Sequence, residues 1–261
     1  MQPMILDKIV EKVKERYEII KKNKPLSMLL NEIAFKEEHE FIFYDLFKRK
    51  DFIFICECKK ASPSKGIIKE DFNYLEIAKE YEEAGADVIS CLTEPFFFLG
   101  SDAYLKDIKR NVSIPVLRKD FIIDPYQIYE SKALGADVIL LIVAILSNQQ
   151  LKDYIELAHS LGMSCLVETH NESEIEKAIE AGAKVIGVNN RNLKDFSMDY
   201  TLSLRMREKY PDVILVSESG LRNKDDVINV KRAKSNGALI GESLMKSDNI
   251  RKTLEEYINA R

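Results

Sequence analysis

Glu57 and Lys59 are an acid and a base two residues apart, directly after the apolar run 52–56, which is typical of a buried strand. Because alternate side chains of a strand point to the same face, these two side chains lie next to each other. Such a pair at the end of a core strand can hold an anionic substrate and exchange a proton with it. It can equally be a plain ion pair, since buried charges require partners. The rest of the chain must decide between the two interpretations.

Polar residues also follow the seven other strands that the apolar pattern predicts. In chain order they are Thr93 and Glu94, then Arg118, Lys119 and Asp120, then Ser147 and Asn148, then Glu168, Thr169 and His170, then Asn189, Asn190 and Arg191, then Glu218, and finally Glu242. The starts of the strands follow plain Gly-Ala junctions instead. Parallel barrels place their chemistry at the carboxyl ends of the strands, so this one-sided polarity predicts an active site there.

The last two of these segments predict a phosphate site. They contribute Ser219 and Gly220 after the seventh strand, and Gly241, Glu242 and Ser243 after the eighth. Glycines and backbone N–H groups at these two places, next to a helix N-terminus, commonly bind phosphate in such barrels. Lys59, Lys119 and Arg191 add positive charge at the same end. The glycines could serve the turns alone, but their paired position favours phosphate.

Several single residues keep a structural alternative. Lys119 can form a salt bridge with Glu57 or Glu168 without any chemistry, and Glu168 can belong to a structural ionic network. His170 stands two positions beyond Glu168 and is more typical of a loop or capping residue than of a base. The aromatic run 96–98 belongs either to the core beneath a loop or to one wall of an aromatic pocket.

A recurring helix-to-strand junction indicates how these residues are positioned. The segments 83–89, 133–139 and 180–186 each end a helical pattern with Gly-Ala and then begin a β-branched strand, and 236–240 repeats this in shorter form. Glycine after the last helical turn is the expected cap, because it tolerates the left-handed conformation.

Eight such units predict the fold. Strand patterns begin near Phe52, Asp87, Ile114, Asp137, Met163, Lys184, Asp212 and Gly237. The helices between them have expected N-caps at Ser101, Asp124, Ser147 and Asn171. Short apolar strands that alternate with helices predict an α/β protein with a parallel sheet covered on both sides. Eight units favour a closed (β/α)8 TIM barrel over an open doubly wound sheet.

Residues 1–48 lie outside this repeat. An apolar stripe formed by Ile5, Ile9, Val10, Val13 and Tyr17 predicts one helix, and 26–33 can form a second. So short a segment seldom holds a stable core alone, so we expect an N-terminal helical extension packed on a single barrel domain 1–261. The segment 249–260 is expected to be the last barrel helix.

The composition narrows the class of function. A length of 261 residues suits one α/β barrel, and a net charge of -4 gives no reason to expect nucleic acid or an acidic membrane as partner. No apolar stretch is long enough to span a membrane and the N-terminus lacks a signal-peptide core, so a cytoplasmic protein is expected. Four scattered cysteines and three histidines predict no metal site, and the cysteines should be reduced and buried.

Taken together, these segments resemble the indole-3-glycerol phosphate synthases of tryptophan biosynthesis. The resemblance lies in 57–66 (Glu-x-Lys-x-x-Ser-Pro-Ser-x-Gly), 92–101, 117–121, 167–168, 187–193, 218–220 and 239–242, and it covers nearly the whole chain. The first of these motifs is highly specific, whereas the phosphate-binding tail alone would not separate this family from other phosphate-binding barrels.

The resemblance implies a small phosphorylated substrate, 1-(2-carboxyphenylamino)-1-deoxyribulose 5-phosphate, and no metal or organic cofactor. Ring closure with loss of carbon dioxide and water gives indole-3-glycerol phosphate. Lys119 matches the general acid, with a pKa that neighbouring cations are expected to lower, and Glu168 matches the base of the dehydration. Glu57 would hold the lysines and the reacting hydroxyl, while Lys59 would bind the anionic substrate and act as a second acid.

The remaining residues are expected to bind the substrate. Asn189 would orient the hydroxyls of the substrate. The other polar contacts of the substrate would come from Ser62, Arg191, Glu218 and Ser219. Phe121, Leu193 and the N-terminal extension are candidates for the apolar slot of the anthranilate ring. A monomer or weak homo-oligomer is expected, with association to other tryptophan-pathway enzymes left open.

Two other functions stay open at this point. A phosphoribosyl-anthranilate isomerase-like barrel would share the phosphate site, but it should pair a Cys or Asp base with an Asp acid. A non-catalytic binding barrel or interaction subunit should lack at least one of Glu57, Lys59, Lys119 and Glu168, and all four are present.

Overall fold

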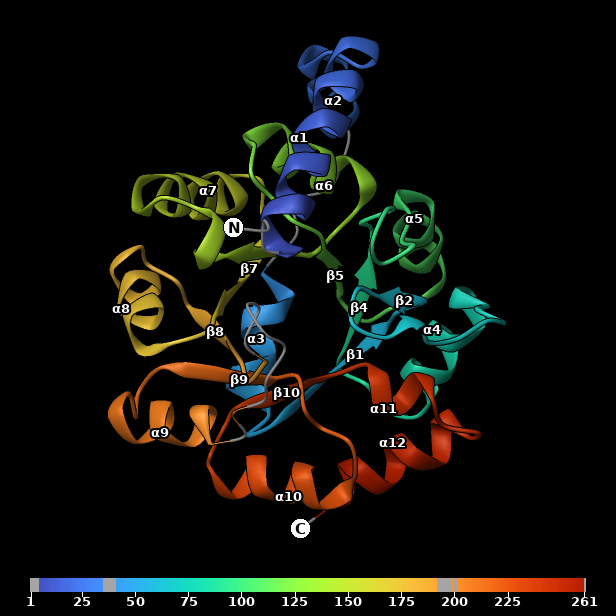
Figure 1. Cartoon of the computed structure of the whole chain (residues 1–261), viewed down its shortest axis with the longest axis vertical. Helices are drawn as coiled ribbons and strands as arrows, with labels where there is room; N and C mark the ends of the chain where they lie inside the picture. Colours follow the sequence, from blue (N-terminus) through green and yellow to red (C-terminus); the bar gives the residue numbers. More distant parts are fainter. Residues whose placement is uncertain (1–4, 35–40, 192–198, 200, 261) are drawn as a thin grey trace.

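A computed structural model of the chain describes residues 5–34, 41–191, 199 and 201–260. Eight parallel strands close into a barrel in the order β1-β10-β9-β8-β7-β6-β5-β4 (Figure 1). They are β1 (Ile53–Cys58), β4 (Val88–Leu92), β5 (Val116–Lys119), β6 (Val138–Ile142), β7 (Ser164–Thr169), β8 (Val185–Asn189), β9 (Ile214–Glu218) and β10 (Gly237–Ile240). The closed barrel is therefore confirmed and the open sheet is excluded. A short antiparallel hairpin, β2 (Ala61–Ser62) and β3 (Gly66–Ile67), follows β1.

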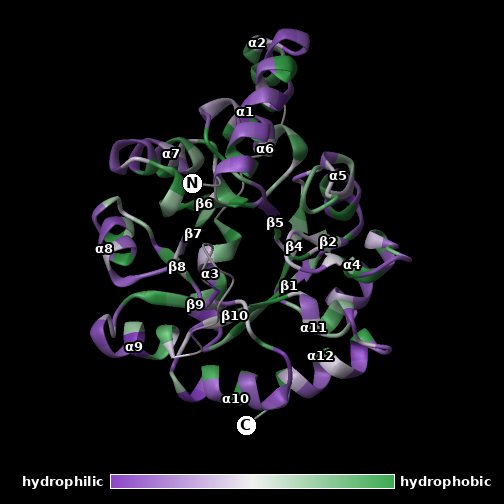
Figure 2. Cartoon of the chain, viewed as in Figure 1, coloured by the Kyte–Doolittle hydropathy of each residue, from purple (hydrophilic) through white to green (hydrophobic). Residues whose placement is uncertain are grey.

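Helices surround the barrel. They are α4 (Tyr74–Glu83), α5 (Asp102–Asn111), α6 (Pro125–Leu134), α7 (Asn148–Ser160), α8 (Glu172–Glu180), α9 (Leu202–Lys209), α10 (Lys224–Arg232), α11 (Glu242–Met245) and α12 (Ile250–Ile258), with a 3-10 turn η1 (Val143–Ile145) after β6. The four predicted N-caps are confirmed, because each side chain accepts a backbone N–H of its helix. Figure 2 shows hydrophobic residues concentrated on the strands and polar residues on much of the outer ring.

Strand alternation separates two apolar layers. One layer faces the helices and includes Phe54, Cys56 and Ile89, whereas Ile55 and Leu117 belong to the layer that fills the barrel. Because side chains alternate along a strand, Glu57, Lys59 and Lys119 share the inner face with these residues. All four cysteines are free and buried, as expected.

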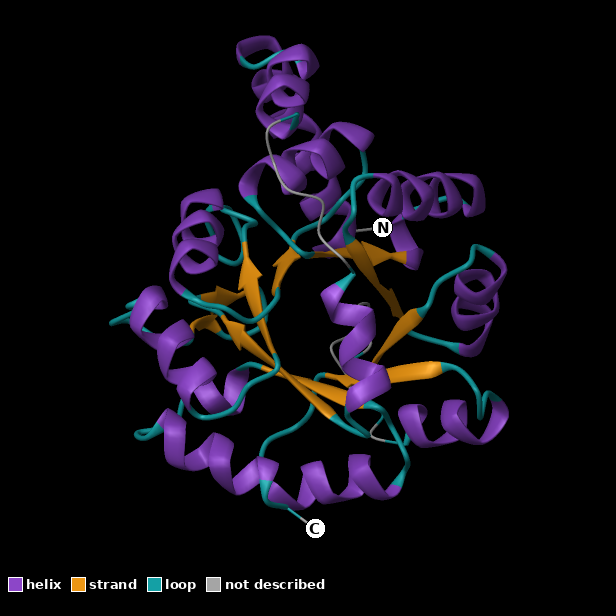
Figure 3. Cartoon of the chain, turned by 180° about the vertical axis from the view of Figure 1, so that it is seen from behind, coloured by secondary structure: helices purple, strands orange, loops and turns teal. Residues whose placement is uncertain are grey.

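A helix that the sequence analysis did not anticipate closes one end of the barrel. This is α3 (Ile42–Arg49), whose Phe43 and Tyr44 pack against the inner layer, and Figure 3 shows the helix lying across the barrel opening. The Tyr44 hydroxyl accepts a hydrogen bond from the backbone N–H of Cys165, near the start of β7. The amino-terminal ends of the strands are thus covered.

The N-terminal helices lie on the other side of the molecule, against α6. They are α1 (Ile5–Asn23) and α2 (Leu26–Ile33), at the top of Figure 1. Ile9, Val13 and Tyr17 of the predicted stripe are buried against Tyr126 and other residues of α6. The helical extension is therefore confirmed. Among the described residues, no helix is long and apolar enough to cross a membrane.

Candidate active site

A pocket of about 1260 Å³ opens at the carboxyl ends of the strands. Nearly all the predicted site residues line it: Glu57, Lys59, Ser62, Lys119, Phe121, Glu168, Asn189, Arg191, Ser219, Gly220, Gly241, Glu242 and Ser243. Glu218 joins the site through its contact with Lys119. Leu193 lies outside the described residues. The barrel thus gathers side chains from all across the sequence at one mouth.

Lys119 stands at the centre of three carboxylates, which we call the carboxylate cluster. Its Nζ lies 2.7 Å from Glu218 Oε2, 3.6 Å from Glu168 Oε2 and 4.0 Å from Glu57 Oε1. Burial alone would lower the pKa of Lys119, but attraction to Glu218, Glu168 and Glu57 exceeds that effect and raises it. The expected lowering of this pKa by neighbouring cations is therefore wrong. The nearest partner, Glu218, also differs from the two carboxylates that the sequence analysis considered.

Glu57 holds the second lysine. Its Oε2 lies 2.5 Å from Lys59 Nζ, so Glu57 and Lys59 do form an ion pair. Both residues line the pocket, so the pair is more than a structural contact at the end of the strand. Burial would raise the pKa of Glu57, whereas Lys59 and then Lys119 lower it, and the net shift is downward. The ionised carboxylate therefore links both lysines.

Two glycines make room for the carboxylates. A Cβ on Gly187 of β8 would overlap Glu218 Oε1, and a Cβ on Gly241 would overlap Glu57 Oε2. Burial raises the pKa of Glu218 to about 7, with Glu168 adding repulsion and Lys119 opposing the shift. Among the described residues, no donor reaches its Oε1. Glu218 is thus the carboxylate of the cluster that takes up a proton most easily.

Glu168 lies between three polar partners. Asn189 Nδ2 donates to its Oε1 at 3.0 Å, His170 Nε2 lies 3.2 Å from the same oxygen, and Lys119 approaches Oε2. Burial would raise the pKa of Glu168, but Lys119 and His170 hold it well below its usual range. His170 lies in the loop between β7 and α8, as expected, and in addition its ring contacts the candidate base. The two-residue spacing of Glu168 and His170 along one strand end was the signal for this contact.

The loops after β9 and β10 form the opposite rim. Ser219 and Gly220 have φ angles of 64° and 85°, so two successive residues adopt the left-handed conformation. Ser243 Oγ donates to Leu221 O at 2.9 Å and joins the two loops. The first N–H groups of α11 have no partner within that helix. The side chain of Glu242 pairs with Lys246 at 2.7 Å, so only its backbone suits an anion.

An apolar wall completes the pocket. Phe98 and Phe121 line it, with ring centroids 5.9 Å apart, and Ile5 and Ile9 of α1 line it as well. The aromatic run is divided: Phe98 belongs to the pocket wall, Phe97 is partly buried against the N-terminal extension, and Phe96 is exposed.

Glu94 fixes this aromatic loop and was missed as a functional residue. Its carboxylate accepts the backbone N–H groups of Phe96, Phe97 and Phe98 at 2.9, 2.7 and 3.0 Å. Because a carboxylate that accepts several N–H groups holds a turn firmly, Glu94 sets the position of Phe98 in the wall. A carboxylate two residues before the aromatic run was the available signal.

Arg191 contacts the hairpin that covers the mouth. Its NH1 group donates to Ser64 Oγ at 3.3 Å, and its NH2 group lies 3.7 Å from Glu242. Ser62, the serine expected to share its role, is buried in the same hairpin and lines the pocket. These contacts connect the loops after β1, β8 and β10.

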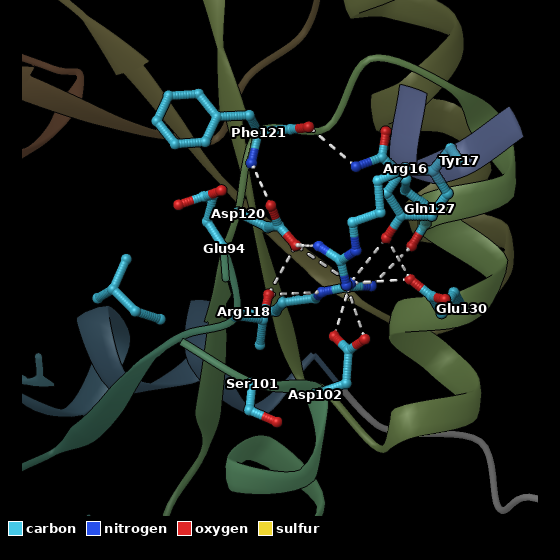
Figure 4. A network of polar contacts seen from close by, with 12 residues as sticks. Arg16, Tyr17, Glu94, Ser101, Asp102, Arg118, Asp120, Phe121, Gln127 and Glu130 are labelled. Carbon is cyan, nitrogen blue, oxygen red and sulfur yellow. Dashed lines mark hydrogen bonds and ion pairs between the residues drawn. The ribbon is translucent and has the colours of Figure 1, made fainter. Parts of the chain in front are cut away.

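Behind Lys119, Arg118 points away from the pocket into a buried network (Figure 4). Its NH2 group contacts Glu130 at 2.8 Å, Asp102 at 3.0 Å and Asp120 at 3.2 Å, and it donates to the Tyr17 hydroxyl at 3.1 Å. Asp120 accepts the N–H of Phe121, so the network reaches the pocket wall. Strand alternation relative to Lys119 was the sequence signal for this opposite orientation.

Comparisons with known proteins show the family of this chain. Residues 6–257 match the family model described as indole-3-glycerol phosphate synthase. A protein of that name from Ruminiclostridium cellulolyticum is 55% identical over 94% of this chain and 95% of its own length. One from Endomicrobium trichonymphae is 54% identical over 97% of this chain and 99% of its own.

A solved structure shows the same fold at low identity. The thiamine phosphate pyrophosphorylase from Pyrococcus furiosus superimposes with a TM-score of 0.62 and 16% identity, over 82% of this chain and 96% of that one. At this identity the likeness concerns the fold alone. The family match and the two relatives show the family: this chain belongs to the indole-3-glycerol phosphate synthases.

Proposed function

We propose that this protein is the lyase that its family name describes. It closes the ring of 1-(2-carboxyphenylamino)-1-deoxyribulose 5-phosphate, with loss of carbon dioxide and water, to indole-3-glycerol phosphate. The observation that carries the proposal is the ammonium of Lys119 among three carboxylates, in a pocket with an apolar wall and an opposite rim of glycine-containing loops.

Substrate binding follows from the two rims. The phosphate binds the N–H groups of Ser219, Gly220 and the start of α11, where a helix N-terminus favours negative charge. Lys59 adds its charge between this rim and the reacting atoms. The aryl ring lies against Phe98 and Phe121, and Asn189 orients the hydroxyls of the ribulose part.

Ring closure needs an acid and a place for positive charge. As the aryl carbon attacks the ketone, the carbonyl oxygen gains an electron pair and takes a proton from Lys119 Nζ. An alkoxide is a stronger base than an amine, so the transfer is downhill even though the pKa of Lys119 is raised. The carboxylates of Glu57, Glu168 and Glu218 stabilise the cationic ring until carbon dioxide leaves and returns the electron pair.

Dehydration completes the reaction. The ring nitrogen donates its electron pair through the aryl ring and expels the hydroxyl, which leaves as water with a proton from Lys59, because Lys119 has already given up its own. Glu168 then removes the remaining C–H proton and the aromatic indole forms. The low pKa of Glu168 keeps this base ionised in the resting protein.

Two features of the site oppose the alternative functions. The isomerase-like alternative needs a Cys or Asp base, but Cys56 and Cys58 belong to the layer that faces the helices. A non-catalytic barrel has no need for Glu57, Lys59, Lys119 and Glu168 in contact within one pocket.

A fluorescence assay for indole-3-glycerol phosphate tests the proposal. The purified protein should convert the substrate, and Lys119→Ala should lose at least about a hundredfold in kcat, as expected for removal of a general acid. Lys106→Ala, at an exposed lysine of α5, is the matched control and should retain full activity. Absence of turnover by the wild type, or equal activity of the two variants, would overturn the proposal.

We propose further that the protein acts in the cytoplasm as a monomer or weak homo-oligomer that can associate with other enzymes of tryptophan biosynthesis. Four free, buried cysteines suit a reducing compartment. Sedimentation of the pure protein, alone and mixed with those enzymes, measures both properties.

A further inference from the structure

His170 bridges the candidate base to a second carboxylate outside the carboxylate cluster. Its Nε2 lies 3.2 Å from Glu168 Oε1, and its Nδ1 lies 3.1 Å from Glu174 Oε2 in the first turn of α8. The backbone N–H of His170 donates to the same Glu174 oxygen at 2.8 Å. Asn171 Nδ2 donates to the other oxygen of Glu174 at 2.8 Å. The imidazole therefore has a carboxylate on each ring nitrogen, and the outer carboxylate is itself held in place.

Two carboxylates beside one buried ring favour its doubly protonated form. A neutral imidazole has one N–H and one lone pair, so one of the two carboxylates would face a lone pair. Burial would lower the pKa of His170, but the contacts with Glu168 and Glu174 raise it to about 10. An imidazolium donates from Nδ1 to Glu174, and its charge attracts Glu168, which Nε2 approaches without a hydrogen bond.

The charged groups around His170 also favour its imidazolium form. Among the described residues, its ionisable partners are Glu168 on β7 and Glu174 on α8, and Lys119 on β5 lies beyond Glu168. The turn η1, which packs on α8, carries only Val143, Ala144 and Ile145, and Asn189 on β8 is neutral. Of the other charged residues of α8, Glu172 and Glu176 pair with Lys209, and Lys177 and Glu180 belong to its last turn.

A charge count explains why a third cation is useful. The three carboxylates of the cluster and Glu174 meet two ammonium groups, Lys59 and Lys119, so four negative charges face two positive ones. An imidazolium at His170 adds a third positive charge and contacts two of these carboxylates. Without it, one carboxylate of the cluster would bind a proton more readily near neutral pH.

We propose that His170, held by Glu174, is a positioning residue of the reaction: it keeps Glu168 ionised and turned toward Asn189. This inference rests on the proposed role of Glu168 as base and adds a residue pair to it. If His170 had only a structural role, it would hold the first turn of α8 in place through Glu174. The charge of its ring would then have no effect on turnover.

The charge of the ring can be measured without activity. The chain has three histidines, so protein labelled with ¹⁵N-histidine gives a simple spectrum, and His170→Gln assigns the signal. At pH 8 the His170 ring should be an imidazolium, whereas His159, whose pKa burial lowers, should be neutral. A neutral His170 ring at pH 8 would overturn the proposal, whatever the enzyme assay shows.

The pH profile tests the effect on catalysis. In His170→Gln the acidic limb of kcat/KM should move up by about one pH unit or more, which is a tenfold loss on that limb, with kcat on the alkaline side within about twofold of the wild type. Glu174→Gln should shift the same limb by less, because His170 keeps one carboxylate. His159→Gln is the control histidine and should leave the profile unchanged.

The outcomes separate this proposal from the proposed function. Wild-type turnover together with an inactive Glu168→Gln supports the function by itself. If His170→Gln and Glu174→Gln then give the wild-type profile, or lose activity equally at every pH, the positioning role is refuted while the function stands.

Discussion

Replacing Arg118 should show how strongly the buried network behind the active site supports the fold. The side chain is 0% exposed, and Arg118→Met keeps much of its length while it removes the charge. Arg16 would still contact Asp102 at 2.8 Å and Asp120 at 3.6 Å. Glu130, whose side chain is 10% exposed, would keep the Tyr17 hydroxyl and lose its ion pair with Arg118.

The size of the destabilisation follows from the buried charge of Glu130, which is left without its ion pair. Breaking a buried ion pair by removal of one partner costs about 3–5 kcal/mol. One kcal/mol shifts the midpoint of a domain of this size by roughly 2–4 °C, so Tm should fall by roughly 6–20 °C. Asp120 also accepts the backbone N–H of Phe121 in the pocket wall. We therefore expect the KM of Arg118→Met to rise as well.

Thermal unfolding followed by circular dichroism measures the effect, with Lys106→Met as the surface control. The double variant Arg118→Met with Glu130→Gln should recover part of the loss, since the charge that was left without a partner is gone. A Tm within about 2 °C of the wild type, or strictly additive losses in the double variant, would refute the reasoning about the network.

Three further predictions concern the site and its pH dependence. Gly187→Ala should displace Glu218 from Lys119 and lower kcat at least tenfold, while Lys106→Ala at the exposed face of α5 leaves kcat unchanged; kinetics on both variants check this. Glu94→Ala should free the loop that carries Phe98 and raise KM about tenfold, with a smaller change in kcat, in steady-state assays. The folded-state pKa of His170, about 10, exceeds its ordinary value of 6.5, so its contribution to stability is complete below pH 6.5 and is lost as the pH rises toward 10. Denaturant unfolding should therefore show a steeper loss between these pH values in the wild type than in His170→Gln, and parallel curves would contradict the shift.

Local patterns in the chain were sufficient for the architecture. The Gly-Ala junctions, the apolar strands and the caps such as Asp124 and Ser147 depend on nearby residues, and each was predicted where the structure has it. The stripe of α1 and the bounds of α2 followed from helical periodicity in the same way. In contrast, α3 has too short an apolar pattern to reveal that it covers the floor of the barrel, because its role depends on the closure of eight distant strands.

The set of residues at the pocket was likewise predictable, since barrel topology brings every strand end to one mouth. Sequence alone identified Glu57, Lys59, Lys119 and Glu168 as its charged groups and tied them to a known family. It could not decide which carboxylate is nearest to Lys119, in which direction the pKa of Lys119 moves, or that His170 contacts Glu168. Those properties depend on distances of a few ångströms between residues that are far apart in the chain. Electrostatic energy changes steeply over such distances in a buried site, so only the tertiary structure fixes them.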